Sequence, residues 1–191
     1  PNGHFALPMD IGVAREHIWV TGNTVVDALR FIRRTEAFRR TTAPIEPRDG
    51  ERLLLVTLHR RESWGDILEG MCRALGTIVQ RHPGVRVAFP THLNPAVRGS
   101  VAGVLGGTDR ISLLGPLDYL SFLAQMEASW LVLTDSGGVQ EEAPVLGKPV
   151  LVLRETTERP EAIESGVATL VGTGEQAIVG AVERFLANPA E

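Results

Sequence analysis

After residue 51, the chain alternates between two patterns of hydrophobic positions. Short runs rich in valine and leucine have the length of buried strands, and after each run apolar residues recur at helical spacing. This alternation predicts right-handed βαβ units and therefore an α/β fold, a doubly wound, Rossmann-like parallel sheet that is covered on both faces. The expected strands are 52–58, 85–90, 111–114, 130–134, 149–153 and 167–171, and the expected helices are 67–79, 95–105, 119–127, 136–143, 158–164 and 175–187.

The amino-terminal segment has a different pattern. An apolar run at 18–20 predicts a short strand, which leads into a helical pattern over 21–38 with Thr21 or Asn23 as the N-cap. Residues 41–51, TTAPIEPRDGE, are rich in proline and turn-forming residues, which is typical of a boundary. We therefore divide the chain into 1–40, a connecting strand–helix segment, and 41–191, a domain.

Composition limits the classes of protein and of partner. A hydrophobic content of 43% and a charged content of 22% are ordinary for a soluble globular domain. The net charge of −4 does not favour nucleic acid as a partner, and no apolar run approaches the roughly 18 residues of a membrane span. The single cysteine, Cys72, excludes an internal disulfide and predicts a core position in a reducing, cytoplasmic protein. The chain begins PNGH and ends after a helical pattern, so we expect a fragment of a longer protein.

Polar and titratable residues collect directly after the expected strands. In a doubly wound sheet, ligands bind outside the carboxyl ends of the strands. The segregation of these residues therefore predicts a binding site along one edge of the sheet. The segments concerned are HRRES (59–63), THLN (91–94), GPLD (115–118), DSGG (135–138) and RETTERP (154–160).

The stretch LTDSGGVQEEAP (133–144) combines a turn with the start of a short helix that Pro144 and Gly147 limit. Helix N-termini bind anions through free N–H groups and the helix dipole, and glycines let a phosphate approach the backbone. The alternative is a capped turn. The two glutamates at 141–142 either complement the dipole or accept hydrogen bonds from sugar hydroxyls. The fingerprints of NAD-binding and P-loop proteins, G-x-G-x-x-G and G-x-x-x-x-G-K-[ST], do not occur.

Cationic residues occupy two of the other strand ends. Residues 59–61, His-Arg-Arg, follow a buried strand and combine fixed charge with a group that titrates near neutral pH. The alternative is a solvated loop with Glu62 as the internal partner. Arg159 is a second cation for a diphosphate, unless Glu158 neutralises it. No set of His, Asp and Glu residues has the spacing of metal ligands, so we expect no metal.

Two further residues have more than one interpretation. His92 follows the strand at 85–90, where a histidine either caps its loop or faces a ligand. Phe122 lies on the helix after Asp118, where an aromatic side chain either packs in the core or stacks on a base.

Five stretches together resemble the non-hydrolysing UDP-N-acetylglucosamine 2-epimerases. They are TGNTVVDAL, LHRRESWG, PTHLNPAVR, LTDSGGVQEEAPVLGKPVLVLRETTERPEAI and LVGT, and the resemblance runs from about Ile18 to about Phe185. Members of that family have two Rossmann-like domains in a GT-B arrangement, with the nucleotide sugar between them. This chain is similar to the C-terminal, nucleotide-binding domain.

The resemblance implies a role for each matching position. One group of residues would bind UDP, another would face the phosphates and the sugar, and a third would help to bind a second, regulatory UDP-sugar. The residues implied are Ser136, Gly137 and Gly138 for the diphosphate, Glu142 for the ribose hydroxyls, Phe122 for the uracil, His59 and Arg159 as catalytic cations, and Arg60 and His92 for the regulatory ligand.

The family reaction interconverts UDP-GlcNAc and UDP-ManNAc by elimination and re-addition of UDP, without a redox cofactor or a metal. The acid and base carboxylates lie in the N-terminal domain, which has no counterpart here. We therefore expect this chain to bind UDP or UDP-GlcNAc weakly and not to epimerise alone; a homodimer stays open. Alternatives are the nucleotide-sugar half of a GT-B glycosyltransferase, a non-catalytic UDP-sugar sensor and a flavodoxin-like interaction module.

Overall fold

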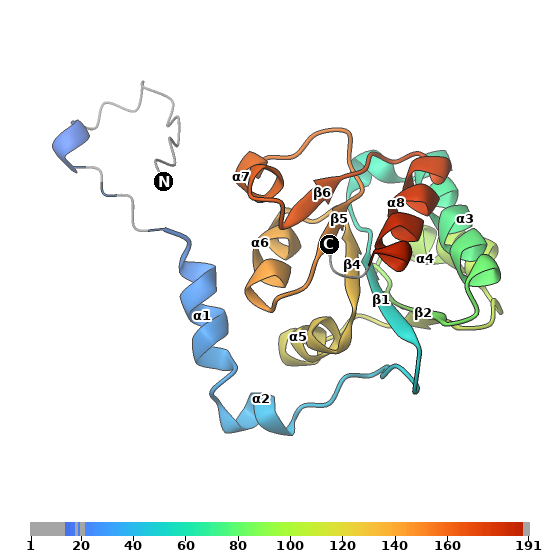
Figure 1. Ribbon diagram of the computed structural model, residues 1–191, viewed down its shortest axis with the longest axis horizontal. Coiled ribbons are helices and arrows are strands. Elements are labelled where there is room, and N and C mark those ends of the chain that lie inside the picture. The colour runs from blue at the N-terminus through green and yellow to red at the C-terminus, as the bar shows by residue number, and fades with distance from the viewer. Residues whose placement is uncertain (1–13, 18, 20–21, 189–191) are drawn as a thin grey trace.

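The computed structural model describes residues 14–17, 19 and 22–188 of the chain. It contains a six-stranded parallel sheet with helices on both faces (Figure 1), which confirms the expected doubly wound fold. The strands are β1 (Arg52–Thr57), β2 (Val85–Pro90), β3 (Ile111–Leu114), β4 (Leu131–Thr134), β5 (Val150–Val152) and β6 (Ala168–Leu170). The helices of the domain are α3 (Asp66–Arg81), α4 (Pro95–Leu105), α5 (Tyr119–Ala128), α6 (Gly137–Val145), α7 (Pro160–Glu164) and α8 (Glu175–Ala187).

The strand order is β3-β2-β1-β4-β5-β6, so the direction of winding reverses between β1 and β4. The loops that follow these two neighbouring strands lead to opposite faces of the sheet, which leaves a crevice where ligands bind in such folds. The two strands stay in register to their ends, where Thr57 lies opposite Thr134. Their hydroxyl oxygens are 2.6 Å apart. The residues after β1 and after β4 therefore start from adjacent points.

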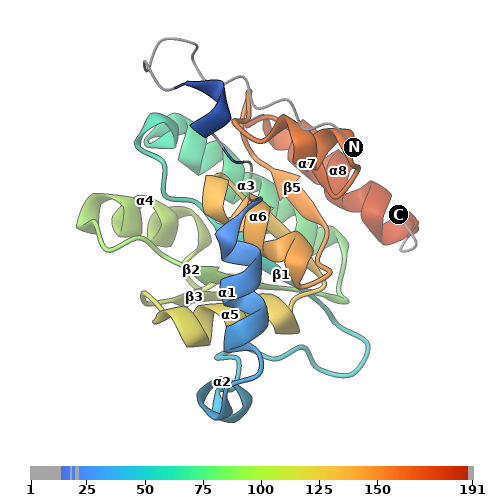
Figure 2. The same cartoon turned by 90° about the vertical axis from the view of Figure 1, so that its left-hand side faces the viewer.

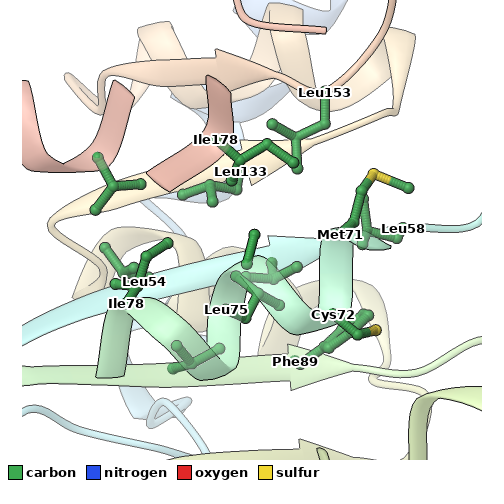
Figure 3. Packing of buried hydrophobic residues seen from close by; sticks show 14 of the residues in the cluster. Leu54, Leu58, Met71, Cys72, Leu75, Ile78, Phe89, Leu133, Leu153 and Ile178 are labelled. Atoms are coloured by element: carbon green, nitrogen blue, oxygen red, sulfur yellow. The ribbon is translucent and has the colours of Figure 1, made fainter. Parts of the chain in front are cut away.

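The core explains why the strands are continuous apolar runs. Along β1, Leu54 and Val56 belong to the cluster on the α3 and α8 side of the sheet, whereas Leu55 belongs to the cluster on the α5 and α6 side. Successive side chains of a strand point to opposite faces, so a sheet that is covered on both faces buries every position. Figure 3 shows the larger cluster, in which Leu75 and Ile178 lie between α3, α8 and the sheet.

The helical pattern predicted over 21–38 is two helices, α1 (Thr24–Ile32) and α2 (Glu36–Arg40). Thr35 separates them, because its hydroxyl donates to the carbonyl of Ile32 and accepts from the N–H of Phe38 as the N-cap of α2. Asn23 caps α1 as predicted, by accepting from the N–H of Val25. The other candidate cap, Thr21, lies outside the described residues, as do positions 18 and 20 of the expected first strand.

The segment before β1 packs onto the domain. Leu29 of α1 and Phe38 of α2 are buried against Leu123 and Ala124 of α5. Figure 2 shows α1 in front of α5 and α6, and α1 contacts α6 directly. Within the described part of the chain, none of the helices has the length and hydrophobicity needed to cross a membrane.

Two predicted helix boundaries were wrong by a few residues. Pro144 does not end α6, which continues to Val145, because a proline in the last turn removes just one intrahelical hydrogen bond. Gly147, the second predicted limit, does end the helix, because it takes a φ of 70° and donates its N–H to the carbonyl of Pro144. α7 begins at Pro160 rather than at residue 158, since proline favours the first helical position.

Candidate functional site

The site lies at the carboxyl ends of β1, β4 and β5. The N-terminus of α6 forms its centre. Ser136 is the N-cap, with its hydroxyl oxygen 3.5 Å from the N–H of Val139, and Gly137 and Gly138 are the first helical residues. A Cβ atom added to Gly137 would lie 3.9 Å from the Arg60 guanidinium. Free helix N–H groups beside a guanidinium form a site for an anion with several oxygens.

Asp135 joins the loops after β1 and β4. Its side chain is fully buried and accepts hydrogen bonds from the backbone N–H groups of His59, at 3.0 Å, and of Arg60, at 2.9 Å. Arg60 returns a hydrogen bond from Nε to the backbone carbonyl of Asp135, at 3.1 Å. These bonds fix the cationic loop after β1 beside the start of α6.

His59 is half exposed and contacts this buried carboxylate, with its Nδ1 atom 3.2 Å from Oδ1 of Asp135. The hydrogen bond to Asp135 raises the pKa of His59 above its ordinary value, against the opposing effects of burial and of the nearby Arg60. The imidazole is therefore cationic over a wider range of pH than a free histidine. Such a group donates a proton or a hydrogen bond near neutral pH.

Arginines and glutamates form an ion-pair network around the same edge. The carboxylate of Glu158 accepts from Arg154, at 3.1 Å from Nη2, and from Nη2 of Arg60, at 3.2 Å. The hydrogen bond from Arg154 lowers the pKa of Glu158 to about 2. Glu158 therefore pairs with these two arginines and does not neutralise Arg159, which was one of the alternatives. Glu62 is the internal partner expected for the loop, and its Oε1 atom lies 3.5 Å from Nη1 of Arg60.

Arg159 is held by α6 and by its own loop. Its Nε donates to the carboxylate of Glu141, and its Nη1 donates to the carbonyl of Glu158 at 3.0 Å. The buried Gln140 positions the same loop, because it accepts from the hydroxyl of Thr157, which in turn accepts from the N–H of Arg159. These contacts bring Arg159 beside Glu141, in the second turn of α6.

Glu142, in α6, and Phe122, in α5, are the residues expected to face the ribose and the uracil. The hydroxyl of Tyr119, at the start of α5, donates to Glu142 of α6 at 2.9 Å. Burial raises the pKa of Glu142, and the Tyr119 hydrogen bond opposes this effect. Phe122 is three residues after Tyr119, so it lies on the same face of α5, where it packs against the cluster that contains Leu55 and Val132. Phe122 thus contributes to the core at the border of the site.

His92 is separate from this group. It follows β2, which lies on the far side of β1 from β4. Its Nδ1 accepts from the N–H of Asn94 at 3.0 Å, and its ring centre is 6.0 Å from that of Trp64. His92 therefore caps its loop, and the loop that carries Arg60 lies on the neighbouring strand.

A family model described as UDP-N-acetylglucosamine 2-epimerase matches residues 9–191. The chain belongs to this epimerase family. A probable UDP-N-acetylglucosamine 2-epimerase of Ralstonia nicotianae is 51% identical over 181 residues, which are 92% of this chain and 48% of that protein. The chain thus spans about half the length of the curated epimerases that it matches.

Solved structures of epimerases agree with this assignment. The Staphylococcus aureus MnaA–UDP co-structure is 35% identical with a TM-score of 0.81, over 94% of this chain and 47% of the other. The Neisseria meningitidis UDP-GlcNAc 2-epimerase bound to UDP-GlcNAc is also 35% identical with a TM-score of 0.81, over 93% of this chain and 49% of the other. The expected fold class, one Rossmann-like half of a GT-B fold, is confirmed.

Sequence reasoning missed four contacts in this chain. It assigned no role to Asp135, Tyr119 or Arg154, and it assigned Glu141 to the helix dipole alone. One signal was available for Asp135, since an acidic residue directly after a fully apolar strand has to find donors at the sheet edge. The described residues contain no group of three or more potential metal ligands.

Proposed function

We propose that this chain is the UDP-binding part of a UDP-N-acetylglucosamine 2-epimerase, which interconverts UDP-GlcNAc and UDP-ManNAc. The observation that carries this function is the N-terminus of α6, which opens with Gly137 and Gly138 beside the Arg60 guanidinium and the His59 loop. A helix N-terminus with small residues and adjacent cations suits a diphosphate better than a single carboxylate.

The UDP moiety extends from this point across α6 towards α5. Ser136, Gly137 and Gly138 bind the diphosphate, and Glu142 accepts hydrogen bonds from the ribose hydroxyls. Glu142 is one helical turn beyond Gly138. Its carboxylate already accepts a hydrogen bond from the hydroxyl of Tyr119, which orients it to accept a second one from a ribose hydroxyl. Phe122 lies on the Tyr119 face of α5, where the uracil reaches it.

The cations act on the other side of the diphosphate. In the reaction, a base removes the C2 proton while the C1–O bond breaks, so that UDP leaves and a 2-acetamidoglucal forms. UDP then adds back to C1 as a proton is delivered to the opposite face of C2. His59 and Arg159 stabilise the charge that develops on the departing diphosphate. Arg60 and His92 help to bind a second, regulatory UDP-sugar.

The rest of the protein supplies the acid and base carboxylates. The matched epimerases are about twice as long as this chain, and in the proposed enzyme the nucleotide sugar binds between this part and the other half. The 191 residues alone bind UDP or UDP-GlcNAc weakly and do not epimerise. Residues 1–40 connect the halves, the protein acts in the cytoplasm in cell-surface polysaccharide biosynthesis, and it does not bind nucleic acid or membranes.

Titration of the isotope-labelled chain with UDP, UMP and phosphate, followed by NMR, tests the binding function. UDP is expected to bind with a Kd of about 0.1–1 mM, to shift the amide signals of Gly137 and Gly138, and to bind at least about tenfold tighter than phosphate. If UDP leaves these two amides unmoved, the proposed site is wrong.

Gly137→Ala provides the matched variant. The added methyl meets no atom closer than 3.9 Å and the backbone is helical, so the fold tolerates it, but it occupies the surface that the diphosphate approaches. UDP affinity should fall about tenfold while the Tm is kept or raised, since alanine favours helices. Gly103→Ala in α4, where the methyl meets nothing within 4 Å, is the control and should leave UDP affinity unchanged.

Incubation of the chain with UDP-GlcNAc in D₂O tests the second part of the function. Exchange of the C2 proton requires the acid and base carboxylates, so no exchange is expected from the 191 residues alone. Exchange at a rate typical of an enzyme, about 1 s⁻¹ or more, would show that this chain contains the whole catalytic apparatus.

A further inference from the structure

The buried carboxylate of Asp135 is the feature that the proposed roles leave unexplained. Its side chain is fully inaccessible to solvent, and burial of a charge is costly unless donors surround it. Its donors are the backbone N–H groups of His59 and Arg60, and Nδ1 of the His59 imidazole lies 3.2 Å from Oδ1 of the same carboxylate. Asp135 therefore organises a loop that sequence alone would leave free to move.

The contact between Asp135 and the imidazole also sets the orientation of the His59 ring. The atom that faces Asp135 is Nδ1 of His59, at 3.2 Å, and 47% of the His59 side chain is exposed. The two ring nitrogens lie on opposite sides of an imidazole ring. When Nδ1 is held against a buried carboxylate, Nε2 points away from that carboxylate.

We propose that Asp135 is a positioning residue, which holds His59 with its proton on Nδ1 and so presents Nε2 to the diphosphate beside the start of α6. The role of Nε2 rests on the proposed function, whereas the orientation of the ring does not. In the imidazolium form, Nε2–H donates to a phosphate oxygen. In the neutral form, Nε2 has a lone pair instead and is a poor neighbour for phosphate.

The charged groups that act on His59 are Asp135, which favours the imidazolium, and Arg60, which disfavours it. Because the hydrogen bond to Asp135 raises the pKa of His59, the donor form persists closer to neutral pH. UDP affinity should therefore be highest at low pH and should decrease as the pH rises through that raised value. The UDP phosphate itself titrates near pH 6. The dependence of UDP affinity on pH therefore has to be measured for His59→Gln as well and subtracted from that of the original protein.

A second histidine–carboxylate pair gives a matched control. Nε2 of His82, which directly follows α3, lies 3.2 Å from the carboxylate of Glu183 in α8, but 36% of the Glu183 side chain is exposed. The distance between ring nitrogen and carboxylate oxygen is the same as in the His59–Asp135 pair. The carboxylate of Glu183, however, is not buried and accepts no backbone N–H groups of the candidate site. Glu183→Gln changes a histidine partner far from α6 and should leave UDP affinity unchanged.

The first test uses the unmodified chain and ¹⁵N NMR of its histidine rings. At high pH, neutral His59 is expected with the proton on Nδ1 and a free Nε2. The opposite tautomer, with the proton on Nε2, would overturn the inference without any variant and without UDP.

The second test is Asp135→Asn. If the amide oxygen keeps the backbone donors, the amide N–H₂ faces Nδ1 and forces the His59 proton onto Nε2. We expect this tautomer switch, a lower pKa of His59 and a weaker dependence of UDP affinity on pH, because the neutral ring then keeps Nε2–H as a donor to the phosphate. An unchanged tautomer and titration in a folded Asp135→Asn protein would refute the positioning role, even if UDP binds. If Asp135→Asn does not fold, the tautomer of the unmodified protein decides.

The two hypotheses fail differently. If the unmodified chain shows the Nδ1–H tautomer but does not bind UDP, the proposed function is wrong and the Asp135–His59 arrangement stands. If UDP binds with the same affinity at every pH after subtraction of the His59→Gln titration, the site is correct and the presentation of Nε2 to the diphosphate is refuted.

Discussion

Arginine–carboxylate pairs occur at both edges of the sheet, but they differ in how exposed their side chains are. At the amino edge, Arg86 forms two hydrogen bonds with Glu51, at 2.7 and 3.0 Å, and both side chains are 13% exposed. At the carboxyl edge, Arg60 pairs with Glu158 and Arg159 pairs with Glu141, and these side chains are between 23% and 51% exposed.

The remaining arginines of the amino edge are fixed by the backbone. Arg110 donates from Nη1 to the carbonyls of His82 and Val85, and Arg52 donates to the carbonyl of Leu186 while its guanidinium lies 4.6 Å from the ring centre of Trp130. A carbonyl within the fold cannot leave, so these arginines are structural. At the carboxyl edge, Arg60 and Arg159 each donate to one backbone carbonyl as well, but carboxylate side chains hold their other N–H groups, and under the proposed function a diphosphate takes the place of these anions. The same residue types therefore stabilise one edge, whereas at the other edge they are arranged as the proposed diphosphate site requires.

The largest effect on the ligand is expected from Arg159→Ala. Loss of a charged hydrogen-bond donor to phosphate should weaken UDP binding by about 30-fold, which corresponds to about 2 kcal/mol. The partly exposed pair with Glu141 contributes little to folding, so the Tm should change by less than about 2 °C. NMR or calorimetric titration with UDP and a thermal melt measure the two quantities on one sample.

The opposite result would make Arg159 a structural residue, like the arginines of the amino edge. If Arg159→Ala lowers the Tm by several degrees and leaves UDP affinity intact, then the Arg159–Glu141 pair is a structural link between α6 and α7.

Arg86→Ala tests the opposite edge and should affect stability instead. The variant leaves the largely buried Glu51 without its main partner, so we expect the Tm to fall by about 5 °C. UDP affinity of the folded protein should stay within about twofold of the original value, because the pair is at the other end of the strands. A large loss of UDP affinity at temperatures well below the Tm would show that the two edges are coupled.

Local sequence signals predicted the fold because each element depends on nearby residues. The apolar runs specify the strands, and Asn23 and Ser136 cap their helices as side chains of that type do. Thr35 is also a cap, but the apolar positions on both sides of it continue at helical spacing, so the break between α1 and α2 was missed.

The contacts within the site could be predicted less well because they join distant segments. Asp135 meets residues 59 and 60 only because β4 lies beside β1, and no local pattern gives that strand order. Likewise, Glu141 meets Arg159 only when α7 packs near α6. Residue types at the strand ends thus predicted where a site lies, whereas the partner of each charge required the three-dimensional structure.

Glu158→Gln should have a smaller effect, in the direction of tighter binding. The glutamine keeps the shape and still accepts from Arg60 and Arg154, but one negative charge is removed beside the diphosphate site. We expect UDP affinity to rise about threefold at about 50 mM salt and the gain to disappear at about 0.5 M salt, since Glu158 is half exposed. Weaker UDP binding at low salt would instead show that Glu158 is needed to orient the arginines.

The smallest effect concerns the dependence of stability on acid. The hydrogen bond from Arg86 lowers the pKa of Glu51 to about 2, from an ordinary value of 4.5. A lowered pKa in the folded state stabilises the fold above the unfolded value, and this contribution is lost as the pH falls from about 4.5 towards 2. The Tm difference between the original protein and Glu51→Gln should therefore be largest near neutral pH and close to zero near pH 2.

Glu158 has a pKa of about 2 as well, with Arg154 as the main cause, so its contribution is lost over the same range of pH. Salt should affect the contributions of Glu51 and Glu158 differently. The Glu51 pair is 13% exposed and should keep its acid dependence at about 0.5 M salt, whereas the acid dependence that Glu158 contributes should vanish. Thermal melts of both variants across pH, at low and high salt, measure this difference. An equal response to salt would mean that exposure does not distinguish the fixed arginines from those available to a ligand.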